Sequence, residues 1–316
     1  MDPSSALLAP PPFDEENADI VLRSCEGVEF HVYKSILSQA SGFFTSMFTL
    51  PQPTSSSSSD DGRIPVTEDT RTLDSLLRIC YPGPPYNLDN DLSHISNVLE
   101  AARKYEMVWA LQRAKEALVR FAQNEPVRAY AVACHHNLEV QARECAKLAL
   151  RIPLETIIST NIEELRSIDG VEFQRLLHYR SKCRNVAAAV AKGWAWSMPT
   201  PPLRPFWARE NCCPREIRRD VDGNEYYCQP WWFRLMDAVA VELEKSSWDG
   251  VLQPSFVFTQ FITHHSSVLC TNCRPRAALE IVAFTTRFSE RVREAIDQVS
   301  KIVGLWILRA LLRPSG

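Results

Sequence analysis

The stretch that decides the fold of the amino-terminal part is DIVLRSCEGVEFHVYKSILSQASGFFTSMF, residues 19–48. Residues 19–25 and 28–32 are rich in strand-forming side chains and flank a Glu-Gly pair, which predicts two short strands joined by a hairpin. Residues 33–48 space their apolar side chains as a helix does, but Ser41-Gly42 interrupts the pattern. We therefore expect two short helices after the hairpin.

The pattern changes from strands to helices after this stretch. Residues 51–62 are rich in proline and serine and predict a mobile loop, followed by a short strand at 64–66. A helix from about Thr70 is stopped by the prolines from Pro82 onward, and short helical segments continue to residue 190. Early strands followed only by helices predict an α+β fold with a mainly α-helical carboxy-terminal part.

Several blocks of this sequence, taken in chain order, resemble the BTB/POZ domain family. They are Asp19-Ile20-Val21-Leu22, Phe30-His31-Val32-Tyr33-Lys34-Ser35-Ile36-Leu37, Phe43-Phe44-x-x-Met47-Phe48 after Ser41, Thr72-Leu73-x-x-Leu76-Leu77-x-x-Cys80-Tyr81-Pro82 and Leu99-Glu100-Ala101-Ala102-x-Lys104-Tyr105-x-Met107. Many members of the family have a second histidine at the position that Tyr33 occupies in this chain. Leu50-Pro51-Gln52-Pro53 and the appended helices resemble the fungal members. The resemblance implies a BTB/POZ fold and a function in protein–protein association, often with homodimerisation.

The predicted domain organisation follows from these breaks in composition. It consists of a flexible Pro-rich lead at 1–14, a BTB/POZ domain at 15–122, a helical extension at 123–197, a Pro-rich linker at 198–205, and a Cys/Trp-rich region at 206–316 that ends in a helix from about Arg276 to Leu312.

Composition and charge exclude several classes of function. The 35 Lys and Arg against 38 Asp and Glu give a net charge of −3, which provides no basic field to attract nucleic acid. A phosphate-binding loop needs closely spaced glycines, but the closest two, Gly304 and Gly316, are 12 positions apart. Gly-x-Ser-x-Gly and His-Glu-x-x-His motifs are also missing from the sequence. We therefore expect a protein that is not an enzyme.

Residues 1–13 do not resemble an export signal, so we expect none, and no apolar run is long enough to span a bilayer. We therefore expect no membrane partner, a cytoplasmic or nuclear location, and reduced cysteines.

The cysteines of the carboxy-terminal region leave two interpretations open. Cys270 and Cys273 have the two-residue gap of half a structural zinc site, and Cys228 with Cys213, or with Cys212 in its place, could supply the other half. A second C-x-x-C pair is missing, which favours the other interpretation, buried reduced thiols that pack as small apolar groups. The cofactor prediction is therefore one structural zinc ion or none.

Tryptophans and arginines in the same region also have two interpretations. Six of the eight tryptophans lie between residues 194 and 248, and aromatic rings with interleaved cations can stack on single-stranded nucleic acid. The arginines at 215, 218 and 219 are surrounded by acidic residues, however, which favours buried rings and a solvated charged face. A nuclear regulatory protein that binds nucleic acid through this region is the alternative function of a different class.

Candidate interaction residues come from the resemblance. Asp19 and Lys34 resemble a charged-pocket pair, and if both were buried they would have to pair, because an isolated buried charge is very costly. Phe43, Phe44 and Met47 are candidates for a dimer interface or, alternatively, for the core. Because the amino-terminal segment is short and contains three consecutive prolines, we do not expect a strand swapped between subunits.

A cullin ubiquitin ligase is one candidate partner. The family's cullin contact has a hydrophobic residue, any residue and then Glu, whereas this chain has Leu50-Pro51-Gln52, which lacks the acid. The predicted function is a non-enzymatic protein-interaction module, a scaffold or adaptor, with a cullin-ligase substrate adaptor as one alternative.

Overall fold

The computed structural model describes residues 7–50, 63–198, 214–245, 255–256, 259 and 274–311, without the side chains of 274–279 and 302–311. The chain divides into two compact units, Met1–Cys145 and Ala146–Gly316. Their boundary lies inside the predicted helical extension at 123–197. The division into five segments stays a prediction.

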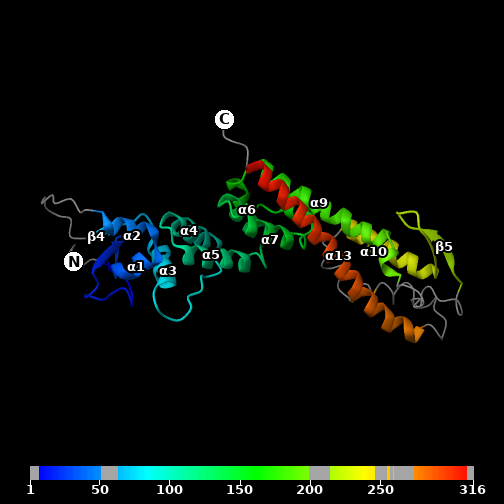
Figure 1. Ribbon diagram of the computed structural model, residues 1–316, viewed down its shortest axis with the longest axis horizontal. Helices are drawn as coiled ribbons and strands as arrows, with labels where there is room; N and C mark the ends of the chain where they lie inside the picture. The colour runs from blue at the N-terminus through cyan, green and yellow to red at the C-terminus, as the bar shows by residue number, and fades with distance from the viewer. Residues whose placement is uncertain are drawn as a thin grey trace. The chain divides into compact units, whose positions relative to one another are not determined.

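The first unit combines a small sheet with helices (Figure 1). Its elements are β1 (Leu7–Leu8), β2 (Ile20–Arg23), β3 (Val28–Val32), α1 (Lys34–Ala40), α2 (Gly42–Thr49), β4 (Arg63–Pro65), α3 (Thr70–Cys80), α4 (Leu92–Lys104), α5 (Val108–Phe121), α6 (Pro126–His135) and α7 (Glu139–Ala149), the last of which continues into the second unit. The strand order is β1-β3-β2-β4, with β2 antiparallel to β3 and parallel to β4, and β1 parallel to β3. The α+β prediction is confirmed.

The predicted helix break at Ser41-Gly42 is confirmed, and Ser41 explains it. Its hydroxyl accepts a hydrogen bond from the backbone N–H of Phe44 at 3.0 Å and so caps the start of α2. The same hydroxyl donates to the backbone oxygen of Tyr105 at 2.5 Å. The break therefore fixes α2 against the turn that follows α4.

The prediction of a flexible lead at 1–14 is wrong for residues 7–14. β1 pairs with β3, and the backbone N–H of His31 donates to the carbonyl of Phe13 at 2.9 Å. Phe13 is fully buried, and its ring packs edge-on against Tyr81 at 5.0 Å between centroids. A buried aromatic ring offsets the entropy lost in ordering this short segment.

The second unit is mainly helical in its described part. Its elements are α8 (Leu154–Ser159), η1 (Glu163–Ser167), α9 (Gly170–Lys192), η2 (Ala195–Ser197), β5 (Glu216–Arg219), β6 (Glu225–Cys228), α10 (Pro230–Lys245) and α13 (Arg274–Leu311). Figure 1 shows α9 alongside α10 and α13, and α9 packs against both. The predicted carboxy-terminal helix is confirmed.

The prediction of only short helices over 126–190 is wrong for α9, which has 23 residues. It begins with a capping box, in which Asp169 and Glu172 bond each other's backbone N–H groups. Tyr179, Cys183, Ala187 and Ala191 continue its buried face at helical spacing. No helix in the described part of the chain is both long and apolar enough to span a bilayer.

Candidate functional site

Asp19 and Lys34 are in contact, but not as a buried charged pair. Both side chains are exposed. The carboxylate of Asp19 accepts a hydrogen bond from the backbone N–H of Lys34 at 2.7 Å, and the ammonium of Lys34 lies 5.8 Å from the ring centroid of Phe48. Asp19 therefore binds a free N–H at the start of α1, which the dipole of the helix also favours.

The apolar candidates on α2 divide into core and surface residues. Phe44 is only 2% exposed, and its ring stacks on Tyr105 with the centroids 5.2 Å apart, so it belongs to the core. Phe43 is 40% exposed, and its ring lies edge-on to that of Tyr105 with the centroids 5.4 Å apart. Met47 is half-buried, and Leu50 is 64% exposed. Gln52 lies outside the described residues.

The turn between α4 and α5 adds two exposed apolar residues to this region. Val108 and Trp109, the first residues of α5, are 75% and 73% exposed. The start of α2 packs on the same turn, because Ser41 bonds Tyr105 and the carboxylate of Glu106 lies against Gly42. Phe43, Val108 and Trp109 therefore lie on adjoining segments, and we call these three residues the α2–α5 surface.

A partly buried polar network holds the α4 end of this surface in place. The carboxylate of Glu68 accepts hydrogen bonds from the ammonium of Lys104 at 2.8 Å and from the hydroxyl of Tyr105. Burial alone would raise the pKa of Glu68, but these hydrogen bonds outweigh it and lower the pKa. Burial and the bond to Glu68 raise the pKa of Tyr105 far above its ordinary range. These hydrogen bonds thus anchor the segment that leads into Val108 and Trp109.

Sequence reasoning missed Val108 and Trp109, although a signal for Trp109 was available. The buried residues of α5 include Ala110, Ala114 and Ala117, which lie on one helical face. Trp109 falls beside that face, in line with Arg113 and Glu116 at spacings of four and seven. A tryptophan that shares a helix face with charged residues is unusual on a protein surface. This pattern was the signal for the exposure of Trp109.

The buried histidines have structural partners. The Nε2 atom of His94 lies 2.9 Å from the hydroxyl of Ser75, and that of His136 lies 2.8 Å from the hydroxyl of Ser96. Burial lowers the pKa of both imidazoles, that of His136 to about 4. Each histidine is therefore neutral at pH 7 and satisfied within the fold.

The predicted zinc ligands stay a prediction. Cys213, Cys270 and Cys273 lie outside the described residues, and Cys228 is buried at the end of β6. Burial raises the pKa of the Cys228 thiol to about 12. Among the described residues, no cluster of His, Cys, Asp or Glu has the arrangement of a metal site.

The described tryptophans of the second unit are packing residues, as the favoured interpretation predicted. Trp194, Trp231 and Trp232 are at most 5% exposed, and Trp196 packs on Phe284 and Phe288. Trp207 and Trp248 lie outside the described residues.

The arginines at 215, 218 and 219 make contacts within the second unit. Arg218 pairs with Glu216 at 2.7 Å and Asp237 at 2.9 Å, Arg219 pairs with Glu225, and Arg215 lies over the ring of Tyr227. This arrangement does not resemble a stacking platform for bases.

A small sheet-and-helix unit with apolar side chains displayed on its surface has the features of a protein-association domain. Residues 12–122 match the family model of the BTB/POZ domain. This part of the chain is therefore a BTB/POZ domain, a protein-interaction domain. No curated protein matches the chain.

Proposed function

We propose that the protein is a non-enzymatic association module that binds a second copy of itself through the α2–α5 surface. The observation that carries the proposal is the exposure of Trp109, at 73%, next to Val108 on α5. Tryptophan contributes more to binding energy than most side chains when it is buried at an interface. Contiguous exposed apolar groups mark an interaction site more often than scattered single residues do.

The test is the mass of the full chain by light scattering after size exclusion. We expect a species near twice 35.9 kDa, and we expect Trp109→Asp to convert it to the monomer with its circular dichroism spectrum unchanged. Val140→Asp, at a 58% exposed position on α7, is the matched control and should leave the dimer intact. A monomeric wild type at high micromolar concentration would contradict self-association and leave a different protein as the partner.

A cullin adaptor is the second candidate, and the exposure of Leu50, at 64%, favours it. Gln52 can accept a hydrogen bond but supplies no charge, so any contact made there is weaker than one made by Glu. The measurement is binding of the full chain to a cullin amino-terminal domain, with Leu50→Asp as the variant. No binding at micromolar concentration would remove this candidate.

A further inference from the structure

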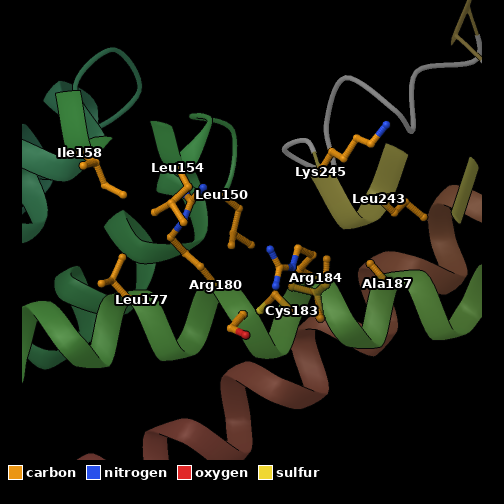
Figure 2. Close-up of a pocket in the computed structure, with 12 residues that line it drawn as sticks. Leu150, Leu154, Ile158, Leu177, Arg180, Cys183, Arg184, Ala187, Leu243 and Lys245 are labelled. Atoms are coloured by element: carbon orange, nitrogen blue, oxygen red, sulfur yellow. The ribbon is translucent and has the colours of Figure 1, made fainter. Parts of the chain in front are cut away.

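The second unit contains a cavity of about 250 Å³ that is lined by residues of α8, α9, α10 and α13 and by Leu150. Part of its lining is apolar and buried, since Leu150, Leu243 and Ile296 are each at most 5% exposed. Figure 2 shows Arg180 and Arg184 extending from α9 toward Leu150 and Leu154. The cavity therefore combines an apolar interior with positive charge.

The charge of the lining is entirely positive among the described residues. Arg180, Arg184 and Lys245 contribute to it, and none of the described lining residues is a carboxylate. The guanidinium of Arg180 donates to the backbone oxygens of Ala149 and Ile152, which are neutral acceptors. Burial lowers the pKa of Arg180, and the positive charge of Arg184 acts in the same direction.

Arg184 is available to a ligand. It is exposed, lies one helical turn after Arg180, and makes no hydrogen bond or ion pair with a residue in the described part of the chain. Glu244 is near enough to feel its charge, but that carboxylate is bonded to Lys192. Glu155, exposed on α8, offsets part of the charge of Arg180 from outside the lining.

The size of the cavity limits its occupant. At about 250 Å³ it is smaller than the roughly 300–1,000 Å³ of sites for drug-sized ligands, and it suits one or two apolar side chains. Ile158, which also lines it, is 70% exposed and extends the apolar surface beyond the cavity. An occupant larger than the cavity would thus find further contact at its edge.

We propose that this cavity binds a peptide segment of a protein partner, which inserts an apolar side chain and places an adjacent carboxylate against Arg184. A guanidinium binds a carboxylate through two parallel hydrogen bonds, and Lys245 adds a second positive charge. An anion there also relieves the repulsion between the two arginines of α9. The site is in the second unit and is independent of the α2–α5 surface.

The test uses the full chain and a fluorescein-labelled peptide pool with Leu or Phe at its centre and Asp or Glu on both sides. Fluorescence anisotropy at physiological salt should show saturable binding of this pool. Arg184→Glu should weaken it by about tenfold or more, because it replaces attraction by repulsion. Ile158→Ser should weaken it by about threefold, the loss expected for part of one apolar contact.

Matched controls come from α13. Arg287→Glu makes the same change of charge at an exposed position outside the lining, and Val282→Ser shortens an exposed apolar residue. Both should bind as the wild type does. The proposal is overturned by equal binding of a pool with Asn and Gln in place of the acids, by unchanged binding to Arg184→Glu, or by no binding at millimolar peptide. It is also overturned if decanoate saturates the site while the peptide pool does not bind.

Discussion

The hydroxyl of Tyr105 donates a hydrogen bond to the carboxylate of Glu68, which links the end of α4 to the segment between β4 and α3. The ring of the same tyrosine stacks on Phe44 of α2. One residue thus joins the polar network to the aromatic core directly beneath the α2–α5 surface.

Glu68→Gln is expected to destabilise the protein at pH 7 by about 1–3 kcal/mol, because it removes charged hydrogen bonds from a nearly buried site. The folded state lowers the pKa of Glu68, so its contribution is fully present above the pKa in the unfolded chain. That contribution disappears as the pH falls through the folded-state value. Urea unfolding from pH 7 to 3 should therefore show the difference between wild type and variant shrinking below about pH 4.5.

The control for this prediction is Glu116→Gln. The Glu116 side chain on α5 is 43% exposed and pairs with Arg113 at 3.3 Å, so its replacement should cost much less stability than that of Glu68. Equal costs for the two variants would contradict a special role for the Glu68 network.

Asp19→Ala is expected to destabilise the first unit by about 1 kcal/mol, the usual cost of losing a carboxylate that binds a helix N-terminus. Lys34→Ala should cost less than half of this, because Asp19 bonds the backbone N–H of residue 34 and not its ammonium. Urea denaturation of the two variants measures both costs. A larger cost for Lys34→Ala would favour a charged pair over a helix cap.

Glu106→Gly is expected to stabilise the protein by about 1 kcal/mol. Glu106 ends α4 with a φ of 52°, and the backbone N–H of Met107 donates to the carbonyl of Ala102 at 2.8 Å. This left-handed helix end favours glycine or asparagine, whereas glutamate is strained there.

Asn137 provides the matched comparison, because it ends α6 in the same geometry with a φ of 53°. Asparagine already suits this conformation, so Asn137→Gly should change the melting temperature much less than Glu106→Gly. A lower melting temperature for Glu106→Gly would show that contact of the Glu106 carboxylate with the start of α2 outweighs the strain.

Local patterns in the sequence predicted the hairpin, the break at Ser41-Gly42 and the carboxy-terminal helix, because each depends on neighbouring residues. β1 was missed, because two leucines in a Pro-rich segment carry no periodicity and the strand exists only through its pairing with β3. The sequence predicted that Asp19 and Lys34 are close to each other. It did not predict that Asp19 bonds the backbone N–H of Lys34 and that both side chains are exposed, since exposure depends on the tertiary structure. Trp109 shows the same limit, because the sequence contains the side chain but not its exposure.

His136 is expected to titrate with a midpoint near pH 4, which can be followed by NMR through its imidazole Hε1 proton. Burial lowers the pKa of His136 to about 4, and the charges of His135 and Arg103 add to the effect. Because the unfolded chain binds this proton near pH 6.5 and the folded chain does not, stability falls as the pH decreases from 6.5 to 4. The total loss from this group is about 3 kcal/mol at about 1.4 kcal/mol for each pH unit.

His136→Gln should remove this loss while its amide still bonds the hydroxyl of Ser96. His31→Gln, on β3 of the same unit, controls for the removal of an imidazole. If the stability of His136→Gln fell with pH in parallel with the wild type, the buried neutral imidazole would not be a source of acid sensitivity. Flattening of the curve in His136→Gln alone assigns the loss to the desolvation of this one side chain.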